Sequence, residues 1–268
     1  MPWLVHGFST RTGGMTTVYG SGDRPTAALG ELNLGLTADD DPEAVRANRE
    51  FLLEALGGPV PPALAGLVTL RQTHSATVHR VDRSDVLGPG ERAVLEGDGL
   101  MTDEPGVLLG IQTADCVPVL VADTRRRAVA GFHAGWRGTL VGIVQEGIGR
   151  LREEFGSAPE DLLAAVGPAI GACCYRVGED VREQFAARFR YADQLFRHPD
   201  PGSSGQSAAG GFHLDLAEAN CLQLMDAGLR RAAIHRTGAC TSCNTGRFFS
   251  YRGENGRTGR MMAVIGVR

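Results

Sequence analysis

The most apolar stretch of the chain lies near its middle and divides into two runs that resemble buried strands. Val107–Ile111 and Val117–Ala122 are short, apolar and rich in branched side chains, and they flank the polar segment 112–116. Continuous apolar runs of this length are typical of strands covered on both faces. We predict two further strands, at Ala128–His133 and Met261–Val267.

Helical patterns occur on both sides of these strands. Asp41-Pro42 predicts a helix start, because Asp is a favoured N-cap and Pro suits the first helical position, and Gly57-Gly58 predicts its end. The apolar stripe assigned to this helix is Val45, Phe51, Leu52 and Ala55.

Further helices follow in the second half. After the turn Gly135–Gly138 we predict one helix with an apolar face made of Leu140, Ile143, Val144, Leu151 and Phe155. The sequence Ser157-x-x-Glu160 has the form of a capping box and predicts another helical turn. Two more helices are expected at Glu179–Phe189 and Leu214–Ala227.

Strands and helices mix without strict alternation, and we find no internal repeat. The prediction is therefore one α+β domain over residues 1–268, with mixed sheets flanked by helices. The segment Arg197–Gly211 is rich in Pro, Gly and Ser and is expected to form a mobile surface loop, while three prolines at 59–62 predict a short stiff connection.

Composition narrows the functional classes. A net charge of −4 without a basic stripe argues against nucleic acid as a partner. The sequence contains no run of 18 apolar residues, so we expect no transmembrane helix, and the start of the chain lacks the pattern of a secretory signal. Six cysteines are too few for a disulfide scaffold, so we expect a cytoplasmic protein. All 27 basic residues are arginines, which excludes Schiff-base chemistry through lysine.

Three metal-competent residues stand where apolar strands meet turns: His74, Cys116 and His133. Two imidazoles and one thiolate can hold zinc and leave a fourth position open, as catalytic zinc sites do. Separations of 42 and 17 residues match no compact metal motif, however. From spacing alone the evidence for a metal site is weak, and a buried core cysteine with two hydrogen-bonded histidines is the more usual explanation of the pattern.

Longer motifs accompany these residues along nearly the whole chain. They are Gly7–Gly14, Asn33-Leu34-Gly35, Gln72-Thr73-His74-Ser75, Gly97–Thr102, Thr113–Pro118, His133–Gly138, Gly167–Tyr175, His213–Leu216, Phe248–Arg252 and Thr258-Gly259-Arg260. In this order they resemble the YfiH family, which is also labelled the multicopper polyphenol oxidase (laccase) family.

The resemblance implies more than the spacing shows. It implies an α/β sandwich shared with cysteine hydrolases of the bacterial cytotoxic necrotising factor type, and a catalytic zinc ion held by His74, Cys116 and His133. Similar proteins phosphorolyse adenosine, inosine, guanosine and methylthioadenosine, and deaminate adenosine to inosine. Purine nucleosides and inorganic phosphate are then the expected partners of a monomer or small homo-oligomer.

Three residues are candidates for further roles. Asp115, beside Cys116, could act as the acid/base that moves protons, or could only shape a turn. Arg137, in a glycine turn that leads into a helix, could bind phosphate together with the helix N-terminus, or could form a structural ion pair. Arg11 is a second candidate for phosphate binding.

The other cysteines suggest no second catalytic centre. Cys240-Thr241-Ser242-Cys243 could be a redox or zinc pair, but no second CxxC accompanies it and no thioredoxin-like context surrounds it, so we favour a structural role. The neighbours Cys173 and Cys174 are too constrained to form a disulfide, and the helical spacing around Cys221 indicates a core position.

Three alternative functions stay open. A copper polyphenol oxidase would need many histidines spread over several copper centres, whereas the chain has seven, although the triad could bind a single copper ion. A metal-free amidase or hydrolase acting on peptidoglycan precursors could use Cys116 as nucleophile and His133 as base. A non-catalytic protein could use the metal only to support its fold.

Overall fold

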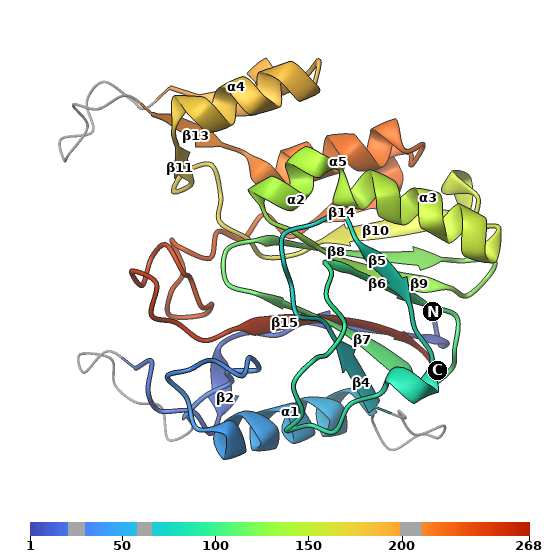
Figure 1. The fold of residues 1–268 in the computed structure, drawn as a ribbon, viewed down its shortest axis with the longest axis vertical. Coiled ribbons are helices and arrows are strands. Elements are labelled where there is room, and N and C mark those ends of the chain that lie inside the picture. Colours follow the sequence, from blue (N-terminus) through green and yellow to red (C-terminus); the bar gives the residue numbers. More distant parts are fainter. Residues whose placement is uncertain (21–29, 58–65, 199–210) are drawn as a thin grey trace.

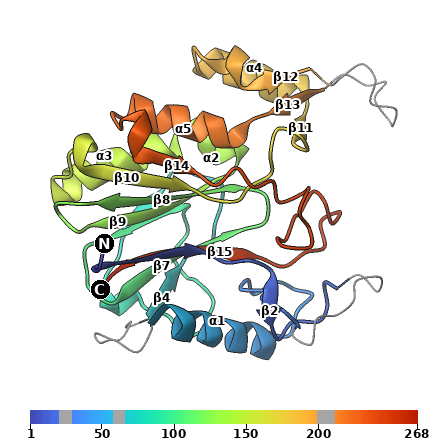
Figure 2. The same ribbon diagram turned by 180° about the vertical axis from the view of Figure 1, so that it is seen from behind.

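Two β-sheets packed face to face form the body of the protein, and helices cover both outer faces (Figures 1 and 2). This computed structural model describes residues 1–20, 30–57, 66–198 and 211–268. The four-stranded sheet has the order β1 (Leu4–Phe8), β15 (Met261–Val267), β7 (Val107–Thr113), β4 (Gly66–Thr69). The six-stranded sheet has the order β14 (Ile234–Arg236), β10 (Leu162–Val166), β8 (Val117–Asp123), β9 (Val129–Ala134), β6 (Gly99–Thr102), β5 (Val78–Arg80).

Each sheet has its own helical cover. The four-stranded sheet packs on α1 (Pro42–Gly57), and the six-stranded sheet on α2 (Trp136–Val141), α3 (Ile143–Phe155) and α5 (Leu216–Asp226). At one end α4 (Glu179–Arg188) lies on a small sheet of β11 (Arg176–Val177), β13 (Phe212–Leu214) and β12 (Phe196–Arg197). The short elements are β2 (Thr12–Gly14), β3 (Gly30–Glu31), and the 3-10 turns η1 (Arg83–Asp85), η2 (Pro159–Asp161), η3 (Ala192–Gln194) and η4 (Arg231–Ala233).

The core therefore has separate apolar layers. Side chains such as Leu109, Ile111 and Leu120 fill the space between the two sheets, and all three are almost fully buried. Further layers lie between each sheet and its helices. The predicted mixed α+β architecture is confirmed, because every large apolar face of a sheet is covered by the other sheet or by helices.

The connection from β7 to β8 positions the functional residues. These strands follow each other in the sequence, yet β7 belongs to the four-stranded sheet and β8 to the six-stranded sheet. The three residues between them, Ala114, Asp115 and Cys116, must pass from one layer to the other. A tight turn thus places polar side chains at the edge where the two sheets meet.

Most of the strongly apolar or capped elements agree with the sequence. The buried strands and the helix that begins at Pro42 are confirmed, and the final strand has the predicted bounds. The stripe of α1 is partly wrong, however, since Phe51 and Ala55 are exposed. In their place the helix buries Asn48 and Arg49, whose side chains bind backbone carbonyls such as those of Asn33 and Leu34.

Two helix predictions need correction. The helix expected after Gly138 is broken at Gly142, which has φ +85° and separates α2 from α3. The capping box at Ser157 is absent: Ala158 is the N-cap of the short η2 turn, and the Ser157 hydroxyl has no partner. The expected loop at 197–211 and the proline connection at 59–62 fall almost wholly outside the described residues.

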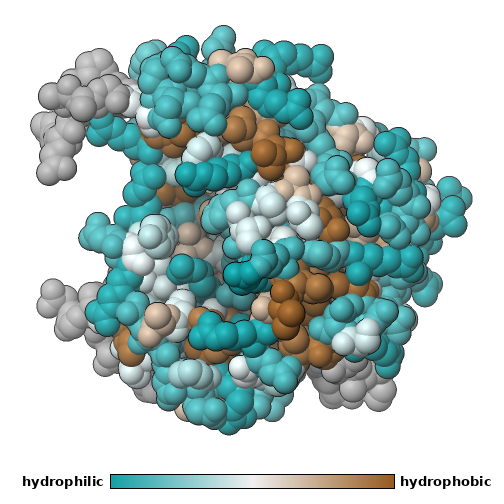
Figure 3. Space-filling view, viewed as in Figure 1, coloured by the Kyte–Doolittle hydropathy of each residue, from teal (hydrophilic) through white to brown (hydrophobic). Residues whose placement is uncertain are grey.

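Within the described residues no helix has both the length and the apolar character that crossing a bilayer requires. The face drawn in Figure 3 is mostly hydrophilic, and its hydrophobic areas are separated by polar side chains.

Candidate metal centre

The two histidines and the cysteine singled out from the sequence meet at the end of the sandwich. His74 follows β4, Cys116 directly precedes β8, and His133 lies in β9. Their ligand atoms all lie within 4.8 Å of one another, with 3.9 Å between Cys116 Sγ and His74 Nε2. Two imidazoles and a thiol gathered in this way form a donor set that suits zinc or copper.

Asp98 connects two parts of this group through its carboxylate, which binds His133 and the turn next to His74. Its carboxylate is fully buried, and Oδ1 lies 2.8 Å from His133 Nδ1. Because an ionised carboxylate only accepts hydrogen bonds, Nδ1 must carry a proton, which leaves Nε2 of His133 as the atom that can bind a metal ion once it has lost its own proton. The other oxygen, Oδ2, accepts from the backbone N–H of Ser75 at 2.6 Å and from that of Thr73 at 3.2 Å.

The ionisation of the group follows from these contacts. Burial raises the pKa of the Cys116 thiol, but the charge and hydrogen bonds of His133 and His74 outweigh it and lower that pKa to about 6. Burial lowers the pKa of His133, whereas Cys116 and Asp98 raise it to about 9. Burial also raises the pKa of Asp98, yet hydrogen bonds from His133 and Ser75 hold it well below its usual range. Cys116 thus reaches the thiolate form that metals bind.

The backbone around the site has unusual conformations. His74 has φ +61° and Asp115 has φ +90°, backbone conformations that residues other than glycine rarely adopt. Gly135 has a different requirement, since a Cβ atom there would lie 2.7 Å from His74 Cδ2 and 3.0 Å from Cys116 Sγ. The absence of a side chain at Gly135 therefore lets the two ligands approach.

Asp115 lines the pocket, but its carboxylate is already engaged. Oδ1 accepts from the hydroxyls of Thr241 at 2.6 Å and Ser250 at 2.7 Å, and Oδ2 accepts from the backbone N–H of Arg252 at 2.6 Å. These contacts resemble those of a residue that fastens a loop. They support the turn-forming alternative more than the acid/base one.

A pocket of about 660 Å³ opens in front of the triad. This volume lies in the range of small-molecule sites. Its aromatic walls are Trp136, Tyr175 and Tyr251, and its positive charges are Arg137, Arg252 and Arg260. Burial raises the pKa of the Tyr175 phenol, so this group stays protonated at neutral pH. The pocket therefore offers flat apolar surfaces beside cations.

The two arginines selected from the sequence lie in different surroundings. Arg137 lines the pocket, is exposed, and stacks on the Trp136 ring at 4.3 Å, with no ion pair to any described carboxylate. Arg11 is 1% exposed, binds Glu31 at 2.9 Å and Glu254 at 2.8 Å, and is not part of the pocket wall. The structure thus gives Arg11 a structural role in place of the substrate contact considered above.

Asp98 is the residue that sequence reasoning missed. It stands in the motif Gly97-Asp98-Gly99, at the start of β6, and nothing in its immediate sequence pairs it with His133. A usable signal exists nonetheless, since metal-bound histidines nearly always donate their second N–H to a carboxylate or carbonyl. An acidic residue next to a buried strand, such as Asp98, is therefore a candidate partner for a metal-binding histidine.

Several known proteins are similar to this chain over most of its length. The family model "Multi-copper polyphenol oxidoreductase laccase" matches residues 5–268. "Purine nucleoside phosphorylase YlmD" of Geobacillus stearothermophilus is 39% identical over 99% of this chain and 94% of its own length. "Adenosine deaminase RL5", from an unknown prokaryotic organism, is 38% identical over 75% of each chain. The crystal structure of the Bacillus licheniformis hypothetical protein YfiH superposes with a TM-score of 0.84 at 34% identity, over 99% of this chain and 93% of that one.

Replacing Asp98 tests its control of the triad. In Asp98→Asn the side chain keeps one acceptor oxygen, so it loses either His133 or the Ser75 turn. We expect zinc affinity to fall by about 10–100-fold, as for other outer partners of metal ligands. Competition with a chelator measures it, and the exposed Asp103→Asn is the matched control. Equal affinities in the two variants would contradict the role given to Asp98.

A methyl group at position 135 tests the close approach of the ligands. We expect Gly135→Ala to weaken zinc binding because its Cβ would displace His74 and Cys116. Gly149→Ala, in α3, is the control, since its Cβ would meet no atom within 4 Å. Metal content and thermal unfolding of both variants would be compared. Full metal content in Gly135→Ala would show that the crowding is relieved without cost to the site.

Proposed function

This chain belongs to the multi-copper polyphenol oxidoreductase laccase family, and from that premise we propose that it is a zinc-dependent purine nucleoside phosphorylase that also deaminates adenosine. The observation that carries the proposal is the meeting of His74, Cys116 and His133 at the floor of a pocket with aromatic and cationic walls. The names of the similar proteins supply the two reactions.

Both reactions balance with simple co-substrates. In phosphorolysis the bond between ribose C1′ and the purine nitrogen breaks, a bond from C1′ to a phosphate oxygen forms, and the purine takes up a proton. In deamination, water replaces the amino group at C6 of adenine, and ammonia leaves. His74, Cys116 and His133 would hold the zinc ion, which would supply Lewis-acid activation of an oxygen atom.

The residues of this chain hold and orient the reactants. His133 is fixed by Asp98 with Nε2 directed to the ligand group, and Cys116 serves as thiolate. Trp136 and Tyr175 offer ring faces on which a purine can stack. We assign phosphate binding to Arg137, whose guanidinium has no competing described carboxylate, and a positioning role to Asp115.

The geometry gives the alternatives less support. The seven histidines all lie in described segments, and only His74 and His133 join a group able to hold a metal. The described residues therefore do not provide the additional histidine ligands that a multicopper oxidase needs. The thiolate–imidazolium character of Cys116 and His133 would suit a cysteine hydrolase. A metal-free hydrolase would not explain why His74 lies beside the thiol of Cys116.

Adenosine is the substrate that tests both reactions. With phosphate present we expect adenine and ribose 1-phosphate, and without phosphate we expect inosine and ammonia, resolved by chromatography. Cys116→Ala should lose at least about 100-fold in both rates, because metal activation contributes several kcal/mol. Cys221→Ala, in the core, should keep both. If Cys116→Ala stays active, or the wild-type protein forms neither product with zinc added, the proposal is wrong.

A second experiment addresses Arg137. We expect Arg137→Ala to raise the KM for phosphate at least about 10-fold while the KM for nucleoside changes little, since a charge-assisted hydrogen bond contributes about 1.5–3 kcal/mol. The exposed Arg152→Ala on α3 is the control. Steady-state kinetics with each substrate varied in turn gives both constants. An equal rise in both would remove phosphate binding from Arg137.

A further inference from the structure

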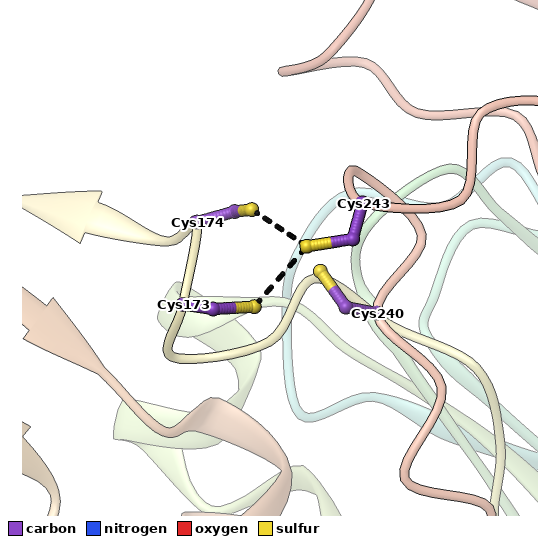
Figure 4. Close-up of side chains that lie close together, drawn as sticks. All are labelled: Cys173, Cys174, Cys240 and Cys243. Carbon is purple, nitrogen blue, oxygen red and sulfur yellow. Dashed lines mark hydrogen bonds between the residues drawn. The ribbon is translucent and has the colours of Figure 1, made fainter.

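Four of the six cysteines meet at a second place, apart from the triad. Cys173 and Cys174 lie on the turn before β11, and Cys240 and Cys243 on the loop after β14. The four sulfur atoms all lie within 4.8 Å of one another, and Figure 4 shows the two pairs facing each other. The second pair that the CxxC sequence lacked is thus supplied by residues about 70 positions away.

The spacing of the sulfur atoms suits a metal ion. Zinc–sulfur bonds of about 2.3 Å in a tetrahedron place the sulfur atoms about 3.8 Å apart. Cys243 Sγ lies 3.5 Å from Cys173 Sγ and 3.3 Å from Cys174 Sγ. A disulfide joins only two sulfurs, at about 2.05 Å, and cannot account for two thiols that face the same third one.

Burial argues against an ordinary core cluster. Cys221 shows how a core cysteine lies in this protein, with no exposed area. In the four-cysteine cluster only Cys240 is buried, while Cys173 and Cys243 are exposed. A backbone bridge between Ala169 and Cys240 joins the two loops, but exposed thiols held side by side gain little from apolar packing, and the bridge alone does not account for four sulfur atoms directed at one point.

Hydrogen bonds from the surrounding residues hold Cys240 and the turn that carries Cys173 in place. The N–H of Gly171 donates to Cys240 Sγ at 3.2 Å, and the side chain of Asn244 holds the carbonyl of Cys240 at 2.8 Å. Gly171 also accepts the N–H of Cys174 at 2.9 Å, which closes the turn that carries Cys173. An amide that donates to a sulfur stabilises the thiolate form and orients it.

From these observations we propose that Cys173, Cys174, Cys240 and Cys243 bind a structural zinc ion. Four thiolates complete the tetrahedron and leave no position for substrate, so the site is closed, unlike the triad with its three ligands. Binding releases the thiol protons and involves no change of oxidation state. This proposal is independent of the reaction proposed above.

The position of the cluster indicates what the ion would stabilise. The segment from 237 to 260 joins β14 to β15 without any helix or strand, and loops of this length normally need a stabilising contact. Thr241, inside the CxxC, donates to Asp115, and Tyr175, next to Cys174, lines the pocket. A zinc ion here would join two loops that form one wall of the pocket.

Metal stoichiometry separates the two sites. We expect the wild-type protein to contain about two zinc ions per chain, Cys116→Ser and Cys243→Ser about one each, and the double variant almost none. Cys221→Ala is the control and should keep both ions. Loss of metal in Cys116→Ser alone, with Cys243→Ser unchanged from the wild type, would overturn the second site and leave the triad standing.

A measurement on the wild-type protein does not depend on the variants folding. We expect Cys173 and Cys243 to be protected from alkylation by N-ethylmaleimide while zinc is bound and to react once a chelator removes it, as mapped by mass spectrometry. The exposed thiols should become at least about tenfold more reactive, since a metal-bound thiolate is withdrawn from attack. Equal rates with and without chelator, or a disulfide between these cysteines in the untreated protein, would overturn the proposal.

Discussion

The buried carboxylate of Asp98 is the constraint on which the geometry of His74, Cys116 and His133 depends. A charged group with no exposed area is costly unless its partners satisfy it, and removal of one partner typically costs about 3–5 kcal/mol. Both carboxylate oxygens have partners. One oxygen accepts from the imidazole of His133, and the backbone N–H of the same residue donates to the backbone carbonyl of Asp98 at 2.7 Å, which fixes the two residues side by side. The second oxygen holds the turn at Thr73–Ser75, and with it His74.

The sandwich explains why this constraint can be met. β4 and β7 belong to one sheet, β6, β8 and β9 to the other, and the three ligands come from the ends or borders of strands in both. Sites built on packed strands are held more precisely than sites on loops, so the buried strands give the ligands a well-defined frame. The crossing between sheets forces Asp115 to φ +90°, and three hydrogen bonds to its carboxylate offset that strain.

Sequence alone predicted the elements whose signals are local. Long apolar runs located the strand 261–267, and the Asp41-Pro42 cap located α1. The break at Gly142 was missed because apolar spacing continues across it, and the box at Ser157 failed because the turn begins one residue later. Site residues depend on contacts distant in sequence, so spacing left the triad open and only the resemblance selected it. The partners of Asp98 and of Cys173 lie 35 and 70 residues away in the sequence, so no local pattern could identify them.

The two groups of metal-competent side chains differ in a way that fits their places in the fold. The triad sits where rigid strands end and a pocket opens, and three ligands there leave room for a substrate. The four cysteines sit on irregular loops that an isolated backbone bridge joins at Ala169 and Cys240, and a closed set of ligands would add to this limited stabilisation. Thr241 lies inside the second group and binds Asp115, which adjoins Cys116 of the first. Disturbance of the loop 237–260 would therefore reach the ligand group through the three hydrogen bonds that Thr241, Ser250 and Arg252 donate to Asp115, so the shape of the pocket depends on the order of that loop.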